Sequence, residues 1–359
     1  MADLNSLRTE IDSIDQELVR LIDRRMEIAR EVGKAKATTG AQTYDAGRHH
    51  AVIEKAVMRG SGACPPDSLR IIFRELLSVS LNLQKALRVA YLGPAATFSH
   101  QAALREFGSA VNFEAYDQIT EVFTAVQNGW TDYGIVPVEN STGGIVHESL
   151  DSFIDFQCSI CHEVLLPIRH SILGNLPLEE VKVLYSHPQP FLQCALWLKE
   201  HMPNVELLEM PSTVAGMQKA RSTANAAAIG SAVAADFYGL RVLAEGIEDN
   251  KDNTTRFLVI GKTDTPRTGD DKTSLMFTSA DKPGALYNVL KPFAERGINL
   301  SKIESRPTKK RAWEYVMFVD LLGHRMDVNV QDAIADLEKN CVWCRVLGSY
   351  PREKGPRHS

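Results

Sequence analysis

A long amphipathic pattern near the N-terminus constrains the fold more than any other feature of this 359-residue chain. Its apolar side chains recur every three or four residues, at Leu4, Leu7, Ile11, Ile14, Leu18, Leu21, Ile28, Val32 and Ala35. This spacing predicts one helix over residues 4–36, about 50 Å long at about 1.5 Å per residue. So long a helix cannot bury its stripe within one small domain. We therefore expect partner helices, some of them from a second protomer.

Polar residues interrupt the apolar faces of this helical region. Arg25 occupies a seam position of the first helix, and a buried guanidinium needs anionic partners. A further helix is predicted from about Asp67, and its apolar face contains Ser80, with Gln84 one turn beyond. These residues predict a polar pocket inside a helical bundle. For Arg25 alone, an ion pair within or between chains is an equally simple explanation.

Three segments carry a resemblance: "SLRTEIDSIDQELVRLIDRRMEIAREVGKAK", "YDAGR" and "SVSLNLQKAL". Together they resemble the all-helical chorismate mutase family over residues 1–88. The resemblance implies that Arg25, and Arg8 from the other protomer of a dimer, grip the two substrate carboxylates. It implies Lys36 and Gln84 as catalytic donors to the ether oxygen, and it adds as pocket residues Asp45, Arg48, His49 and Ser80. A Claisen rearrangement needs a held conformer and donors at the developing charge, and no cofactor.

Two adjacent histidines follow Arg48 in the stretch "TYDAGRHHAV". If this stretch is helical, Asp45, Arg48 and His49 share a face, while His50 points about 100° away and is expected at the surface. Because neighbouring side chains diverge on a helix, a shared metal ion is disfavoured. The chorismate mutases that this segment resembles usually have a glutamate at the position of His49, where it accepts a hydrogen bond from the substrate's ring hydroxyl.

Residues 89–262 alternate apolar strands, polar loops and helices, as in "RVAYLGPAATFSHQAA" and "DYGIVPVENSTGGIVHESL". This pattern predicts an α/β architecture with largely parallel sheets and ligand sites at the carboxyl edges of the strands. Several serine and threonine residues lie near the predicted helix N-termini: Ser99, Ser141, Thr142, Ser186, Ser212, Thr213 and Ser231. Helix capping explains each of these residues taken alone. If several of these helix N-termini converge, they would form an anion-binding site. Nucleotide-binding glycine motifs are missing.

The motifs "GPAATFSHQAA", "VPVENSTGG", "YSHPQPFLQC", "STVAG" and "NTTRFLVIG" occur in one order that resembles prephenate dehydratase. That family folds as two α/β lobes with the site between them. The resemblance implies Thr255 as the essential threonine, and Arg256 is expected to clamp a carboxylate. Because a threonine hydroxyl is a weak acid, we expect it to polarise the departing hydroxyl by hydrogen bonding. The other implied cleft residues are Glu139, Asn140, Ser141, Thr142, Ser186, Gln193, Ser212 and Thr213.

The C-terminal region, residues 272–350, reads as strand, helix, strand, strand, helix and strand, which is a ferredoxin-like order. The order alone implies no function. With "PGALYNVL" and "SKIESRP" it resembles the ACT domain of phenylalanine-regulated enzymes. The resemblance implies a phenylalanine site at a dimer interface formed by Gly284, Ala285, Leu286, Asn299, Glu304, Ser305 and Arg306. The alternative is a plain dimerisation module. Residues 351–359 are expected to form a disordered tail.

Composition narrows the class of protein. The formal net charge of −5 favours neither nucleic acid nor an anionic membrane as a partner. The chain has no apolar run near about 20 residues, and its start is unlike a signal peptide, so a cytoplasmic location is expected. Six cysteines include two C-x-x-C pairs. Both pairs lie in apolar, strand-like runs, so we interpret the cysteines as structural and expect no metal.

Taken together, the chain is expected to be a multidomain protein with an all-α bundle, a two-lobed α/β region and an α+β ferredoxin-like domain. It resembles the bifunctional chorismate mutase–prephenate dehydratase family, which implies conversion of chorismate through prephenate to phenylpyruvate with feedback by phenylalanine. A homodimer or tetramer is expected, without cofactors. Two alternatives stay open: a dehydratase that prefers arogenate, and a non-catalytic amino-acid sensor, against which Thr255, Glu139 and Arg256 argue.

His49 generates a first prediction. A neutral imidazole can accept a hydrogen bond from the substrate hydroxyl, whereas a protonated one donates from both nitrogens. We therefore predict that mutase activity falls as the pH drops through the imidazole range, about 6.5 for an unperturbed histidine. A flat profile between about pH 5 and about pH 8, or an unaffected His49→Ala enzyme, would show that His49 is a bystander.

Overall fold

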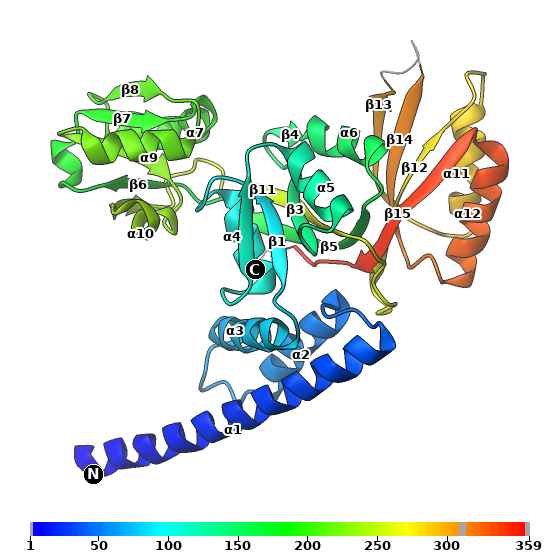
Figure 1. Ribbon diagram of the computed structural model, residues 1–359. Helices are drawn as coiled ribbons and strands as arrows, with labels where there is room; N and C mark the ends of the chain where they lie inside the picture. Colours follow the sequence, from blue (N-terminus) through cyan, green and yellow to red (C-terminus); the bar gives the residue numbers. More distant parts are fainter. Residues whose placement is uncertain (1–2, 309–313, 356–359) are drawn as a thin grey trace. The chain divides into compact units, whose positions relative to one another are not determined.

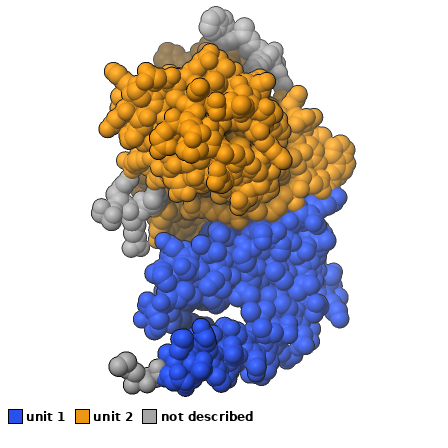
Figure 2. Space-filling model, turned by 90° about the vertical axis from the view of Figure 1, so that its left-hand side faces the viewer, with its two compact units in different colours: residues 1–88, 106–112 blue, residues 89–105, 113–359 orange. Residues whose placement is uncertain are grey.

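The computed structural model describes residues 3–308 and 314–355. The chain divides into two compact units, one built from residues 1–88 and 106–112 and the other from residues 89–105 and 113–359 (Figure 2). Figure 1 shows their elements along the chain. Within the described ranges, none of the helices is both long and apolar enough to cross a membrane. The predicted charged turn at residues 308–312 lies mostly outside the described residues.

The first unit consists mainly of three helices: α1 (Leu4–Thr39), α2 (Ala46–Arg59) and α3 (Pro66–Gln84). The predicted long helix is confirmed, and α1 ends where Gly40 adopts a left-handed conformation with φ of 68°. Helices α1 and α3 approach closely at Gly33, because a Cβ there would lie 2.7 Å from the Cα of Gln84. Much of the α1 stripe stays exposed within this chain: Leu4, Leu7, Ile11, Ile14, Leu18, Leu21, Ile28 and Val32.

Residues 106–112 also belong to the first unit. Glu106 and Phe107 are buried, and both contact the buried Tyr44, whose hydroxyl donates a hydrogen bond to the Glu106 carboxylate. Ser109 donates hydrogen bonds of 2.9 Å and 2.6 Å, from its backbone amide and its hydroxyl, to the Glu75 carboxylate on α3. A short segment from beyond residue 88 thus completes the packing of this unit.

The second unit begins with two lobes, each built on one sheet. The first sheet has the order β2-β1-β3-β11-β5, and the second has the order β10-β6-β9-β7-β8. The strands of the first sheet are β1 (Arg88–Leu92), β2 (Asn112–Tyr116), β3 (Tyr133–Asn140), β5 (Ser159–Pro167) and β11 (Thr254–Gly261), with the short β4 (Gly144–Ile145) paired to β3. Its helices are α4 (Phe98–Phe107), α5 (Ile119–Asn128) and α6 (His147–Asp155).

The second lobe inserts between β5 and β11. Its strands are β6 (Ser171–Gly174), β7 (Val183–Ser186), β8 (Glu206–Glu209), β9 (Ala226–Gly230) and β10 (Arg241–Glu245). Its helices are the 3₁₀ turn η1 (Leu178–Glu180), α7 (Pro188–Gln193), α8 (Ala195–His201), α9 (Thr213–Ser222) and α10 (Ala234–Tyr238).

The expectation of largely parallel sheets is wrong. Strand β11 is antiparallel to both β3 and β5, and β6 is antiparallel to both β9 and β10, while β1–β3 and β7–β8–β9 are parallel. The reason is the course of the chain, which leaves the first sheet after β5, builds the second lobe and returns as β11. The returning strand enters the first sheet from the opposite direction, and alternation of strands and helices alone does not reveal this.

The C-terminal region of the second unit has the predicted ferredoxin-like order: β12 (Asp271–Thr278), α11 (Ala285–Glu295), β13 (Leu300–Pro307), β14 (Tyr315–Leu322), α12 (Val328–Asn340) and β15 (Trp343–Pro351). Both helices cover one face of the sheet β13-β14-β12-β15 (Figure 1). The other face contributes Met276, Phe318 and Leu347 to the hydrophobic core of the first lobe. The two domains are therefore joined through a shared core.

Residues 351–355 do not behave as the disordered tail that was predicted. Pro351 ends β15, Arg352 forms an ion pair with Asp270, and Glu353 accepts hydrogen bonds from the Arg105 side chain and the Leu165 backbone amide. These contacts hold the polar segment on the protein, a placement that its composition does not indicate. Residues 356–359 lie outside the described residues.

Candidate active sites

A cavity of about 220 Å³ lies among the three helices of the first unit. It is lined by every predicted mutase residue except Arg8, namely Arg25, Lys36, Asp45, Arg48, His49, Ser80 and Gln84. Arg8 lies 17 residues before Arg25 on the same helix, which corresponds to about 25 Å at about 1.5 Å per residue. One chain therefore brings together one of the two predicted arginines with all the other predicted pocket residues.

The cavity presents cations that are held by neutral oxygen atoms. Arg25 donates to the Leu76 carbonyl at 3.1 Å and to the Ser80 hydroxyl, and Lys36 donates to the Thr43 carbonyl at 2.8 Å. Burial lowers the pKa of Arg25 and is also the main cause of the lowered pKa of Lys36, which Asp45 opposes and Arg48 reinforces. Within the described part of the chain, no carboxylate forms an ion pair with Arg25 in this cavity. An anionic ligand would complete this arrangement electrostatically.

The two adjacent histidines differ in placement, as predicted, but His50 is not a simple surface residue. His49 is only 5% exposed and lines the cavity. His50 is half-exposed, and its Nε2 lies 3.2 Å from an oxygen of the buried Glu106. Asp45 precedes α2 and accepts a hydrogen bond of 3.0 Å from the Arg48 backbone amide, so it caps the helix while facing the cavity.

The first lobe brings Thr255 together with Asn140. The strand register pairs these two residues across β11 and β3, and the Asn140 Nδ2 donates to the Thr255 Oγ1 at 2.8 Å. The Asn140 Oδ1 accepts hydrogen bonds from the backbone amides of Thr142 and Gly143, at 3.1 Å and 2.6 Å. Asn140 therefore fixes both the threonine and the following loop. Ser141 is bonded to β11 through the Thr254 backbone.

Two further residues belong to this region, although the sequence did not single them out. Asn253 is 2% exposed, and its Oδ1 accepts from the Asn140 Nδ2 at 2.8 Å, while its own Nδ2 has no partner among the described residues. His170 follows β5, and its Nε2 lies 2.8 Å from the Oε1 of the predicted residue Gln193. Burial lowers the pKa of His170, against smaller opposing effects of Gln193 and Glu248. Asn253 lies in the quoted threonine motif, whereas nothing in the sequence links His170 to Gln193.

Glu139 lies on β3 of the first lobe, where the strand register pairs it with Arg256, and it accepts a hydrogen bond from Lys302 at 2.6 Å. The other predicted cleft residues lie on the second lobe: Ser186, Gln193, Ser212 and Thr213. Ser186 ends β7, is fully buried, and its hydroxyl has no hydrogen-bond partner in the described residues. Its backbone carbonyl accepts a hydrogen bond from the Met210 amide at 2.8 Å. Since Met210 lies two and three residues before Ser212 and Thr213, this hydrogen bond places Ser186 near the segment that contains them. Ser212 caps α9 by accepting from the Ala215 amide at 3.0 Å, as the capping explanation predicted.

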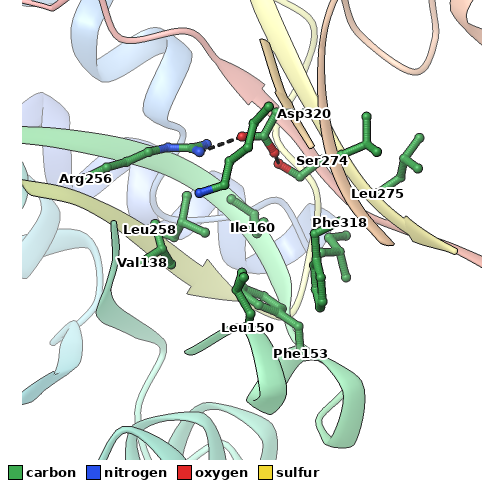
Figure 3. A pocket seen from close by; sticks show the side chains of 13 residues that line it. Val138, Leu150, Phe153, Ile160, Arg256, Leu258, Ser274, Leu275, Phe318 and Asp320 are labelled. Carbon is green, nitrogen blue, oxygen red and sulfur yellow. Dashed lines mark hydrogen bonds and ion pairs between the residues drawn. The ribbon is translucent and has the colours of Figure 1, made fainter. Parts of the chain in front are cut away.

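The structure gives Arg256 a different role from the predicted carboxylate clamp. Successive residues of a strand point to opposite faces, so Arg256 faces away from Thr255. Its guanidinium donates to Asp320 at 2.5 Å (Figure 3). It also donates to Glu163 at 2.8 Å and to the Tyr350 hydroxyl at 2.9 Å. Burial opposes both charges, but mutual attraction prevails, so the pKa of Arg256 is raised and that of Asp320 is lowered. All three guanidinium nitrogen atoms of Arg256 therefore donate hydrogen bonds on the side of the strand that faces away from the cleft.

The predicted phenylalanine residues lie on two elements of the ferredoxin-like domain. Gly284 has a φ of 78° and precedes α11, which begins with Ala285 and Leu286. Glu304, Ser305 and Arg306 lie on β13, and Asn299 directly precedes that strand. The Arg306 guanidinium is occupied by a bidentate ion pair with Asp151 of α6, at 3.0 Å and 3.1 Å.

The cysteines are free thiols in this structure. Burial is the main cause that raises the pKa of Cys158 to about 11 and that of Cys344 to about 12. Both thiols therefore stay protonated at neutral pH, unlike metal-bound thiolates.

Three family models match the chain in order. Chorismate mutase type II matches residues 7–85, prephenate dehydratase residues 89–265 and the ACT domain residues 273–339. A protein of Aquifex aeolicus (strain VF5) named bifunctional chorismate mutase/prephenate dehydratase is 42% identical over 357 residues, covering 98% of this chain and 99% of its own. The chain belongs to this bifunctional family. A Stutzerimonas stutzeri relative of the same name is 40% identical, covering 97% and 98% of the two chains.

Solved structures of this family's dehydratase part confirm the predicted fold. The prephenate dehydratase of Arthrobacter aurescens in complex with L-Phe is 36% identical, with a TM-score of 0.68, over 74% of this chain and 90% of its own. The prephenate dehydratase of Staphylococcus aureus subsp. aureus Mu50 is 30% identical, with a TM-score of 0.65, over 74% of this chain and 100% of its own. Family membership thus confirms the recognition made from the motifs.

The placement of Arg256 predicts a loss of stability without a loss of substrate affinity. Arg256→Met leaves Asp320 buried without its ion-pair partner and removes one of the two cations of Glu163, which lowers the free energy of unfolding by about 3–5 kcal/mol. Urea denaturation measures this loss. The KM for prephenate of the folded variant should stay near that of the parent enzyme.

A matched control is Lys291→Met, which removes the exposed Lys291–Glu295 ion pair and should change stability by less than about 0.5 kcal/mol. If Arg256→Met instead raises the KM strongly and leaves unfolding unchanged, Arg256 acts as the clamp that the sequence predicted.

Proposed function

We propose that this chain catalyses two consecutive reactions at two separate sites and senses the final amino acid through its C-terminal domain. Chorismate is rearranged to prephenate in the helical cavity, and prephenate is converted to phenylpyruvate beside Thr255. Phenylalanine inhibits the pathway from the ACT domain. The observation that carries this proposal is the order of three matched families on one chain. We propose domain limits at residues 1–88, 89–262 and 272–350, and a cytoplasmic location, which the free thiols support.

The mutase reaction requires the substrate to be held in a compact conformer while negative charge develops on its ether oxygen. Arg25 would bind one carboxylate, because its guanidinium is half-buried and bonded only to neutral oxygen atoms. Lys36 and Gln84 would donate to the ether oxygen. The rearrangement transfers no proton, so positioning and electrostatic stabilisation account for the whole effect.

The resemblance assigns the second carboxylate to Arg8, which one chain does not place in the cavity. We infer a homodimer in which α1 packs against a second copy and Arg8 of that copy completes the site. The exposed apolar stripe of α1 supports this arrangement, since a monomer would leave Leu7, Ile11 and Leu18 about half exposed to water. Further assembly to a tetramer is compatible with the same interface.

Mixing two inactive variants tests the shared site. Arg8→Ala and Arg25→Ala should each lose mutase activity, while their mixture recovers up to about a quarter of the parent activity. Random exchange makes half of the dimers mixed, and each mixed dimer has one intact site. Native mass spectrometry, with one of the two variants isotopically labelled, confirms the exchange. If the mixture stays inactive although mixed dimers form, both arginines act within one chain.

The dehydratase reaction expels carbon dioxide and the ring hydroxyl together. The electrons of the breaking carbon–carboxylate bond aromatise the ring, and the departing hydroxide takes up a proton to become water. Thr255 accepts a hydrogen bond from Asn140, so its own proton remains available for the departing hydroxyl. The unpartnered Nδ2 of Asn253 would supply a second donor beside it.

Thr255→Ala tests this assignment in an assay that starts from chorismate. We expect phenylpyruvate formation to fall by at least about a hundredfold, since one positioned proton donor contributes about 10²–10⁴ in rate. Chorismate consumption should continue, so prephenate accumulates. Normal phenylpyruvate formation would overturn the role of Thr255.

Two further measurements decide between the proposed function and its two alternatives. Faster turnover of arogenate than of prephenate by the parent enzyme would favour the arogenate-preferring dehydratase. Phenylalanine binding without turnover of either substrate would favour the non-catalytic sensor.

A further inference from the structure

One strand of the ACT domain is ion-paired to the dehydratase lobe at two points. On β13, Lys302 donates to the Glu139 carboxylate at 2.6 Å. Arg306, four residues later, forms its bidentate pair with Asp151 and also donates to the His147 Nδ1 at 2.9 Å. Both cations are only 14% exposed in their side chains, so solvent screens these pairs less than an open surface pair.

The partners of these cations bracket the loop of residues 140–146. Glu139 directly precedes Asn140, while His147 begins α6 and Asp151 lies one turn further. The loop contains Ser141 and Thr142, and Asn140 at its start donates to Thr255. A Cβ at Gly143 would lie 2.7 Å from the Gln189 Nε2, so this loop also approaches α7 of the second lobe. Strand β13 therefore holds both ends of the loop that carries the substrate-binding residues.

A small cavity of about 20 Å³ lies between the ACT sheet and the first lobe, with Val138, Leu150 and Phe153 on the lobe and Phe318 and Ser274 on the ACT sheet (Figure 3). Lys302 lines this cavity as well. Apolar side chains of the two domains otherwise pack into one core, and Lys302 and Arg306 supply the ion pairs between β13 and the lobe.

The same strand contains the effector motif. Lys302, Glu304 and Arg306 alternate along β13 and therefore share one face. An effector that takes the Nε–Nη2 edge of Arg306 must break its bidentate pair with Asp151, since this edge holds one carboxylate at a time. Occupation of the effector site and retention of the loop then exclude each other.

We propose that Lys302 and Arg306 are positioning residues that hold the 140–146 loop in its substrate-binding arrangement, and that phenylalanine inhibits by taking β13 away from this loop. The proposal rests on the proposed function, in particular on Thr255 and Asn140 as parts of the dehydratase site. Under this proposal, phenylalanine has a higher affinity for the state in which β13 has left the loop than for the state in which β13 holds it. Inhibition through a change of conformation requires such a difference in affinity.

Lys302→Met tests the proposal in the full-length enzyme, with prephenate as substrate. We expect the dehydratase kcat to fall about five- to tenfold, the factor of a typical coupling free energy between sites. Inhibition by phenylalanine should become weaker, because the loop is already released, while calorimetry should find phenylalanine bound at least as tightly as in the parent, because the released state is the one that it binds. Mutase activity in the same preparation should stay at the parent level, and Lys302→Arg should restore both turnover and inhibition.

Two further variants sharpen the comparison. Asp151→Asn removes the partner of Arg306 without altering the effector motif and should act in the same direction as Lys302→Met. Lys291→Met removes an exposed lysine of the same domain and should change neither turnover nor inhibition. Parent values of kcat and inhibition in both Lys302→Met and Asp151→Asn would overturn the proposal. Lost phenylalanine binding in Lys302→Met would also overturn it, because Lys302 would then belong to the effector site.

Thr255→Ala separates this proposal from the assignment of the site. If Thr255→Ala is inactive and Lys302→Met behaves as the parent enzyme, only the positioning role fails. If Thr255→Ala retains dehydratase activity, the site itself is misassigned, whatever Lys302→Met does.

Discussion

The alternation of side chains along β11 is the constraint on which the second unit depends. Thr255 faces Asn140 on one side of the strand, and Arg256 faces a buried group of acids on the other. Glu163 comes from the neighbouring β5 and Asp320 from the ACT sheet, so one guanidinium joins the lobe to the regulatory domain. Lys272 adds a second cation to Glu163, and Ser274 adds a hydrogen bond to Asp320. Two buried acids and two cations thus satisfy one another, which buried charges require.

Patterns with a regular period were predicted well from the sequence. The stripe from Leu4 to Ala35 predicted α1, and the order of the C-terminal elements predicted the ferredoxin-like domain, because each pattern reflects local backbone geometry. The mutase residues that the resemblance implied, except Arg8, line one cavity. The features that could not be predicted from the sequence depend on residues that are far apart along the chain. Arg256 was misjudged because its acids lie 93 and 64 positions away, and the antiparallel β11 follows from the return of the chain.

The two proposed sites use different physical means to recognise related substrates. The helical cavity offers cations bonded to neutral oxygen atoms, a setting suited to a substrate with two carboxylates. The Thr255 region offers a connected set of amide and hydroxyl groups, with Asn140 at its centre. The first setting favours binding of charge, and the second favours orientation of one departing hydroxyl. Each suits the reaction that we propose for it.

The packing of residues 106–112 in the first unit affects how the two activities could be separated. The segment lies beyond the end of the mutase match at residue 85, yet it supplies Glu106 and Phe107 to Tyr44, and Ser109 to Glu75. A chain cut at residue 88 would leave the buried Tyr44 hydroxyl and the Glu75 carboxylate without these partners. An independent mutase would therefore need a redesigned surface at these positions, and excision at the apparent boundary would yield a weakened fragment.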